Sequence, residues 1–143
     1  MAACGSTNLT TGVREIDSDT EGLCFLMARI FDPLVECRRR FGACDHSHCT
    51  RIEAILKYMG RSFARQEKLM DDADYPASAE HRRDHHALVT QLHAMQAARL
   101  CADRDHHVVH EAVTRWAVGH NAQCDLPLGS WAITRRVLPP SKP

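Results

Sequence analysis

The chain has 143 residues, with 18 basic and 18 acidic side chains, so its formal net charge is zero. This length suits one domain with one hydrophobic core. A neutral chain without a long basic run lacks the charge that attracts nucleic acid or an anionic membrane surface, so we expect neither as a partner. Its ten histidines are many for this length, and histidine is the commonest metal ligand, which favours a metal site.

The seven cysteines are an odd number and are scattered along the chain. No segment has the apolar core of a signal peptide or the length of a transmembrane helix. Disulfides are typical of oxidising compartments, whereas cytoplasmic cysteines are kept reduced. We therefore expect reduced cysteines and a cytoplasmic protein.

The first helix is predicted to follow a polar stretch. Residues 1–15 show no periodicity, which predicts a flexible N-terminal arm. Ser18 and Glu21 then form a capping-box pattern, after which apolar residues recur at helical spacing. Pro33 is expected to kink or interrupt this helix.

Three more helices are predicted from their start and stop signals. A second helix begins near Thr50 and ends before Pro76. Ser78 is the predicted N-cap of the third helix, and Asp103 or Asp105 marks the start of the fourth. Each helix has one apolar face, as expected for helices that pack together.

The last segment, residues 126–143, contains Pro127, Pro139 and Pro140 and is predicted to form a C-terminal tail docked by Trp131. The chain shows no alternating pattern typical of strands and no internal repeat. Four helices over residues 16–125, joined by short connections, predict an all-α fold, an antiparallel up-down-up-down four-helix bundle.

Four potential metal ligands occupy two of these helices. His81 and His85 are four residues apart, so both project from one face of the third helix, which is also its apolar face. His120 lies on the inward face of the fourth helix, and Asp125 follows five residues later, just past the predicted helix end. In an antiparallel bundle the start of the third helix and the end of the fourth meet. We therefore predict that these four residues bind one metal ion.

The ligand types narrow the choice of ion. Three nitrogens and one oxygen suit tetrahedral zinc and, with added water, mononuclear iron or manganese. Gln66, Cys124 and Glu67 are considered as additional ligands. We favour Gln66 as a hydrogen-bond partner of the ligands and Cys124 as a small buried residue. Glu67 is about 100° around the helix from Gln66, so it would need a distortion to take its place.

The order of these motifs resembles the hemerythrin family, specifically the bacterial single-domain hemerythrins, over about residues 13–132. The resemblance rests on Glu15-Ile16-Asp17, Phe63 to Met70, Tyr75-Pro76 before the HxxxH pair, Trp116, and the HxxxxD pattern. It implies a hemerythrin-like bundle in which His81, His85 and His120 hold one iron. Asp125 would then be one of two carboxylates that bridge to a second iron.

This chain departs from the family at three ligand positions. The family's first-helix histidine falls on Thr20, its second-helix histidine on Ser62, and its second bridging carboxylate on Gln66. The resemblance therefore implies one complete half-site and one that has lost its histidines. In the family, dioxygen binds to the iron of the lost half. We therefore expect one ion, iron or zinc, and no reversible oxygen carriage of the family's usual kind.

Three alternatives stay open. The first is an oxygen-binding di-iron protein with substitute ligands from Gln66, Cys124, Glu67 or water. The second is a mononuclear iron enzyme that acts on a small oxygen or nitrogen species. The third is a bundle without metal that serves as an interaction module. The sequence assigns no catalytic residue, so we favour metal binding, sensing or scavenging, with a small diatomic molecule as the exogenous ligand.

Overall fold

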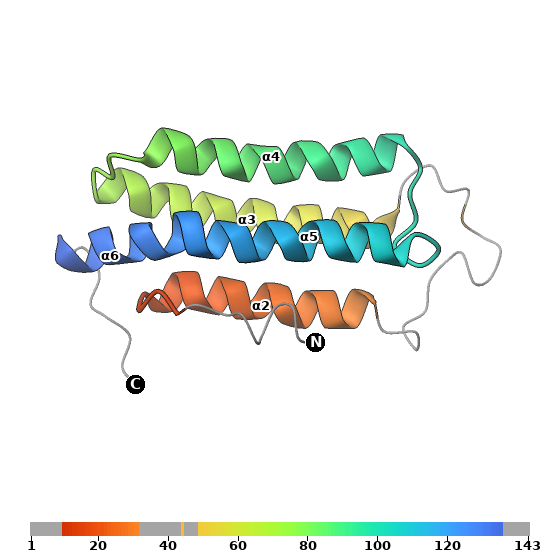
Figure 1. Ribbon diagram of the computed structural model, residues 1–143, viewed down its shortest axis with the longest axis horizontal. Coiled ribbons are helices and arrows are strands. Elements are labelled where there is room, and N and C mark those ends of the chain that lie inside the picture. Colours follow the sequence, from red (N-terminus) through yellow and green to blue (C-terminus); the bar gives the residue numbers. More distant parts are fainter. Residues whose placement is uncertain (1–9, 32–43, 45–48, 136–143) are drawn as a thin grey trace.

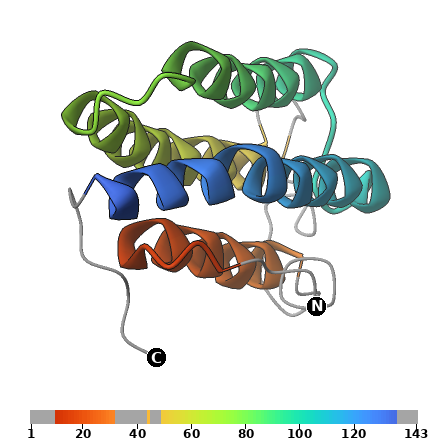
Figure 2. The ribbon, with the colours of Figure 1, turned by 60° about the vertical axis from the view of Figure 1, so that its left-hand side comes forward.

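The computed structural model describes residues 10–31, 44 and 49–135. Its helices are α2 (Arg14–Ile30), α3 (Thr50–Asp72), α4 (Ser78–Ala97), α5 (His106–His120), η2 (Asn121–Asp125) and α6 (Leu126–Thr134). In the views of Figures 1 and 2, α3 and α5 lie between α2 and α4, and α6 continues from α5. The described residues form no strand, so the predicted all-α helical bundle is confirmed. None of the described helices is long and apolar enough to cross a membrane.

The hydrophobic core is divided into two clusters along the bundle. The larger cluster includes Leu23, Met27, Ile52, Ile55, Phe63, Leu88, Leu92, Val109 and Val113. The smaller one consists of Val13, Ile16, Leu69, Met70, Leu128 and Ala132. On α2 and α3, Thr20 and Gln66 fall in the sequence between residues of one cluster and residues of the other. His120 does the same between Val113 of α5 and Leu128 of α6. A layer of polar side chains is therefore held between two apolar layers.

Helix α2 begins at Arg14, four residues before the predicted cap at Ser18. The carboxylate of Asp17 accepts hydrogen bonds from the Thr11 backbone N–H at 2.9 Å, the Thr11 hydroxyl at 2.7 Å and the Gly12 N–H at 3.2 Å. Val13 is fully buried. The predicted flexible arm is therefore wrong for residues 11–15, because Asp17 ties them to the helix. Residues 1–9 lie outside the described part of the chain.

The predicted C-terminal tail is wrong for residues 126–134, which form α6. Pro127 lies in the first turn of this helix, where its missing N–H removes no hydrogen bond. Trp131 does dock the segment, since its indole N–H donates to the carbonyl of Ala73 at 2.7 Å. Gly129 lies against Thr11, and a Cβ there would come 2.8 Å from the Thr11 Cβ. Residues 136–143 are not described.

One cysteine does not follow the expectation of reduced thiols. Cys24 is disulfide-bonded. The thiols of Cys49, Cys101 and Cys124 are free. The partner of Cys24 lies outside the described residues, as does Pro33, where a kink was predicted. The expectation that all cysteines are reduced is therefore wrong for Cys24.

Candidate metal centre

Three histidines meet in the polar layer. His81 and His85, one turn apart near the start of α4, and His120, the last residue of α5, are 2%, 3% and 4% exposed. Their ring centroids are 4.6–4.9 Å apart, and each offers a nitrogen within 4.8 Å of the others. The predicted convergence of these residues is confirmed, and the group could hold a metal ion.

The side-chain oxygen of Gln66 lies among the three imidazoles. Its Oε1 is 2.9 Å from Nε2 of His81, 2.8 Å from Nε2 of His85 and 3.5 Å from Nε2 of His120. Gln66 is 5% exposed and comes from α3, so a second side of the bundle contributes to the group. The oxygen of Gln66 therefore lies close to all three Nε2 atoms.

Asp125 reaches the same layer through a change in helix type. The segment Asn121–Asp125 forms a π-helical turn, in which the Leu126 N–H donates to the Asn121 carbonyl. Five residues along an α-helix would place Asp125 about 140° away from His120, whereas i→i+5 bonding keeps both on one side. Asp125 Oδ1 lies 3.0 Å from Nε2 of His120 and 3.7 Å from Nε2 of His81. Asp125 therefore lies within a continuous helical segment, not past the helix end as predicted.

Two carboxylates orient two of the histidines from behind. Nδ1 of His120 lies 2.5 Å from Oδ2 of Asp84, and Nδ1 of His85 lies 3.3 Å from Oε2 of Glu67. An imidazole that donates its Nδ1–H to a carboxylate presents the lone pair of Nε2 on its other side, as metal-binding histidines commonly do. Nδ1 of His81 is buried and has no hydrogen-bond partner in the described structure.

Each inward-facing nitrogen or oxygen of these residues can present a lone pair to a cation. Neighbouring ligands on one ion, with bonds of about 2.1 Å, are separated by about 3.0 to 3.4 Å in octahedral or tetrahedral geometry. The distances given above from Gln66 Oε1 and Asp125 Oδ1 to the Nε2 atoms run from 2.8 to 3.7 Å. Oxygen and nitrogen lone pairs at such separations repel one another unless a cation or a proton lies between them. The donor set therefore fits one metal ion.

The charges of the metal-free site follow from burial. Burial, together with the charge of His120, lowers the pKa of His81 to about 4 and that of His85 to about 2. Both are therefore neutral at pH 7, which is the form that binds a metal. Burial also lowers the pKa of His120, but hydrogen bonds to Asp125 and Cys124, the charge of Asp125 and the hydrogen bond to Asp84 raise it to about 10. In the metal-free site the positive charge is thus a proton on His120.

The three additional ligands considered from sequence fall into two groups. Gln66 is in contact with all three Nε2 atoms. Glu67 lies behind His85, where its other oxygen pairs with Arg82 at 2.9 Å. Cys124 lies on the Nδ1 side of His120, with its Sγ 3.8 Å from Oδ2 of Asp84. Glu67 and Cys124 therefore lie outside the converging group.

The sequence reasoning missed Asp84. This residue joins His120 and Cys124 in a second group whose donor atoms lie within 4.8 Å of one another. The group shares His120 with the first one through the other ring nitrogen. The backbone carbonyl of Asp84 also accepts a hydrogen bond from the indole N–H of Trp116 at 3.1 Å. The signal in the sequence was its position three residues after His81, which places it on a neighbouring helical face.

The three positions at which the resemblance would place the other hemerythrin ligands lie beside this site. Thr20, Ser62 and Gln66 line a cavity of about 20 Å³ together with His120 and Asp125. The hydroxyl of Thr20 donates to the carbonyl of Ile16 within its own helix at 3.1 Å. The hydroxyls of Thr20 and Ser62 are weak metal ligands, and these two positions offer no nitrogen donor to a second cation.

No family model, no curated protein and no solved structure matches this chain.

Proposed function

We propose that this protein binds a single metal ion, iron or zinc, through His81, His85 and His120, with Asp125 and Gln66 completing the ligand set. One observation carries the proposal: three Nε2 atoms and two side-chain oxygens converge in a buried layer, where each can present a lone pair to a single cation. Three nitrogens and two oxygens suit iron or five-coordinate zinc. The ion would replace the proton and bind the imidazoles as neutral ligands.

We further propose that the bundle is hemerythrin-like, with its helices antiparallel in up-down-up-down order. Two observations support this. The start of α4 and the end of α5 contribute to the same layer, as that order requires. Thr20, Ser62 and Gln66, the positions of the family's remaining ligands, line one cavity beside that layer.

A single ion limits the chemistry. Reversible oxygen carriage in the family takes one electron from each of two irons, and the hydroxyls of Thr20 and Ser62 supply no ligand set for the second. The role that the site supports best is therefore metal binding, with sensing or scavenging of a small diatomic ligand as the function that an iron form would serve.

Metal content is the first test of this proposal. Protein purified without a histidine tag would be analysed for metals per chain and for its aerobic visible spectrum. We expect one ion per chain and no bands of an oxo-bridged iron pair. Two irons with those bands would replace the proposal with the di-iron alternative. A chain that contains no metal and takes up neither Fe²⁺ nor Zn²⁺ would overturn it.

A further inference from the structure

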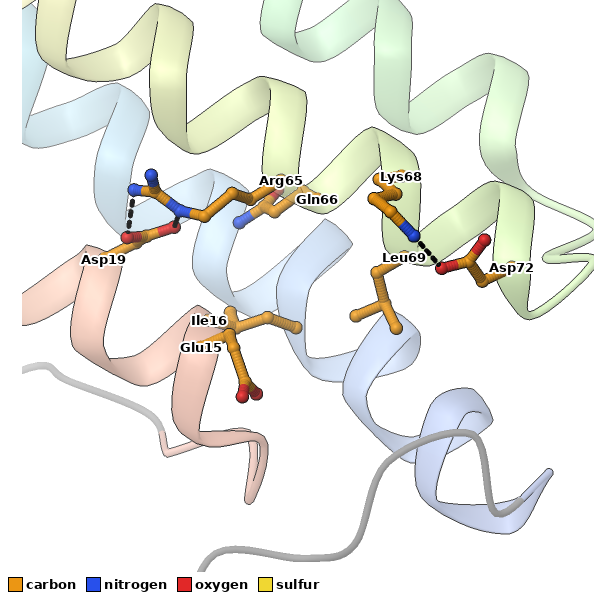
Figure 3. A pocket seen from close by; sticks show the side chains of 8 residues that line it. All are labelled: Glu15, Ile16, Asp19, Arg65, Gln66, Lys68, Leu69 and Asp72. Carbon is orange, nitrogen blue, oxygen red and sulfur yellow. Dashed lines mark hydrogen bonds and ion pairs between the residues drawn. The ribbon is translucent and has the colours of Figure 1, made fainter.

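A cleft opens between α2 and α3. It encloses about 290 Å³ and is walled by the apolar side chains of Ile16 and Leu69. Figure 3 shows Arg65 extending from α3 to Asp19 on α2, and Lys68 turned toward Asp72. Arg65 bonds both carboxylate oxygens of Asp19, at 3.1 and 2.5 Å.

The inner end of this cleft is formed by Gln66. The same side chain lines the cleft, lines the small cavity beside Thr20 and contacts the three histidines. One flexible carboxamide therefore separates the cleft from the position of the ion. Turning it toward the cleft requires only side-chain rotations and breaks no backbone hydrogen bond.

The groove between α3 and α4 offers the alternative approach. It encloses about 420 Å³ and reaches His85, but from the Nδ1 side, where Glu67 lies at 3.3 Å. The ring of Phe63 stacks on His85 with centroids 3.9 Å apart, and Arg82 pairs with Glu67 at 2.9 Å. An ion on this route would have to displace a stacked ring and an ion pair before meeting Nε2.

We propose that the α2–α3 cleft is the passage through which a divalent cation reaches the centre, with Gln66 as its inner gate and the Arg65–Asp19 pair narrowing its mouth. This inference rests on the proposed metal-binding function. The net charge of the cleft favours entry of a cation. Glu15, Asp19 and Asp72 carry three negative charges, against two positive charges on Arg65 and Lys68. Both cations are already paired with carboxylates.

Cobalt uptake tests the passage, because bound Co²⁺ absorbs visible light. Metal-free full-length protein would be mixed with Co²⁺ and the rate of colour formation followed, and removal would then be timed with a chelator. Arg65→Ala widens the mouth and should speed uptake and removal several-fold, while Lys68→Trp narrows it and should slow both. A passage changes both rates by the same factor, so the equilibrium Kd stays unchanged.

Arg83 provides the matched control, since it lines the α3–α4 groove and touches none of the three histidines through any hydrogen bond described above. Arg83→Ala and Arg83→Trp remove a positive charge as the cleft variants do, and should leave both rates unchanged. Three outcomes would each overturn the passage. The Arg83 variants could change the rates as much as the cleft variants do, the cleft variants could leave both rates unchanged, or they could change only one of the two rates and so shift the Kd. Failure of the parent protein to bind Co²⁺ at all would instead overturn the proposed function itself.

Discussion

Gln66 divides the polar layer into two sides that differ in chemistry but share one helical frame. On one side stand His81, His85 and His120, two of which are backed by carboxylates. On the other side stand Thr20 and Ser62, which line a cavity of about 20 Å³. The same apolar clusters hold both sides. Both sides therefore share one fold, and the function of each must be argued from its own side chains.

The two sides also differ in what they require. The hydroxyl of Thr20 is satisfied within its own helix by the carbonyl of Ile16. The histidine side faces inward with lone pairs and two buried or half-buried carboxylates, Asp84 and Asp125, which need a cation or a proton. The contrast predicts that perturbing the histidine side changes metal binding and pH response, while the hydroxyl side responds mainly in packing.

The largest effect is expected from His85→Ala. The change removes one Nε2 ligand and the ring that stacks on Phe63 at 3.9 Å. We expect metal affinity to fall by more than about 100-fold, beyond the loss typical of an outer hydrogen-bond partner. Metal content and melting temperature with and without Zn²⁺ measure it. The control is the neighbouring exposed histidine: His86→Ala should retain full metal occupancy. Unchanged metal content in His85→Ala would contradict its assignment as a ligand.

Rebuilding the hydroxyl side tests the comparison from the other direction. The triple variant Thr20→His, Ser62→His, Gln66→Glu introduces the hemerythrin ligand types at the positions where the resemblance would place them, so we expect two irons per chain and the bands of an oxo-bridged pair. Two imidazoles exceed a cavity of about 20 Å³, so the metal-free variant should lose about 1–3 kcal/mol through overpacking.

The control for this variant places small, uncharged side chains at positions 20 and 62. Thr20→Val with Ser62→Ala should still bind one ion. A triple variant that folds and binds only one ion would show that the helix positions around Thr20 and Ser62 do not match those of a hemerythrin di-iron site.

In the metal-free protein, the three histidines should affect the pH dependence of the free energy of unfolding in two opposite directions. The pKa values of His81 and His85 are lowered on folding, so their stabilisation is present above about pH 6.5 and is lost as the pH falls. The raised pKa of His120 acts in the opposite sense: its contribution is full below about pH 6.5 and is lost as the pH rises toward 10. Stability should therefore be greatest near pH 7.

Between about pH 4 and pH 6 the unfolded chain binds up to about two more protons at His81 and His85 than the folded chain. The free energy of unfolding should then fall by on the order of 2 kcal/mol per pH unit. Urea unfolding of metal-free protein at several pH values measures this slope. The variant His81→Asn, His85→Asn should flatten the acid limb, and an equally steep fall in that variant would place its origin elsewhere.

The smallest effect concerns the carboxylates behind the ring nitrogens. Asp84→Asn keeps the shape but weakens the 2.5 Å contact with Nδ1 of His120, and should lower metal affinity about 10- to 100-fold. Glu67→Gln should cost less, because its contact with His85 is 3.3 Å long and Arg82 shares the carboxylate. Competition titrations with a zinc indicator compare the two. Equal losses, or none for Asp84→Asn, would refute the orienting role.

The histidine side could be predicted from sequence because regular helices have a known period. His81 and His85 at four-residue spacing, and His120 on an apolar face, needed only that period and the order of the helices. The orientation of Asp125 could not be predicted in this way, because it depends on a π-helical turn that residue spacing does not indicate. The central position of Gln66 depends on how far α3 approaches α4 and α5, which the sequence does not state.

The errors in the fold have similar causes. Pro127 suggested that the helix ends there, but proline is also tolerated in the first turn of a new helix. The hydrogen bond from Trp131 to Ala73 favours the helix over a loose tail. Ser18 offered a local capping pattern, whereas the observed start at Arg14 depends on Asp17 reaching back to Thr11. In each case a contact between segments decided between two locally acceptable conformations.

The π-helical turn at Asn121–Asp125 also bears on how this chain tolerates changes in length. An i→i+5 turn accommodates one residue more than an α-helical turn while leaving the helices on either side in phase. Removal of the exposed Gln123 would convert the turn to ordinary α-helix and bring the aspartate to four residues from His120, still on the same face. Five-residue and four-residue spacings are therefore equivalent at this point, and a search for related sites should accept both.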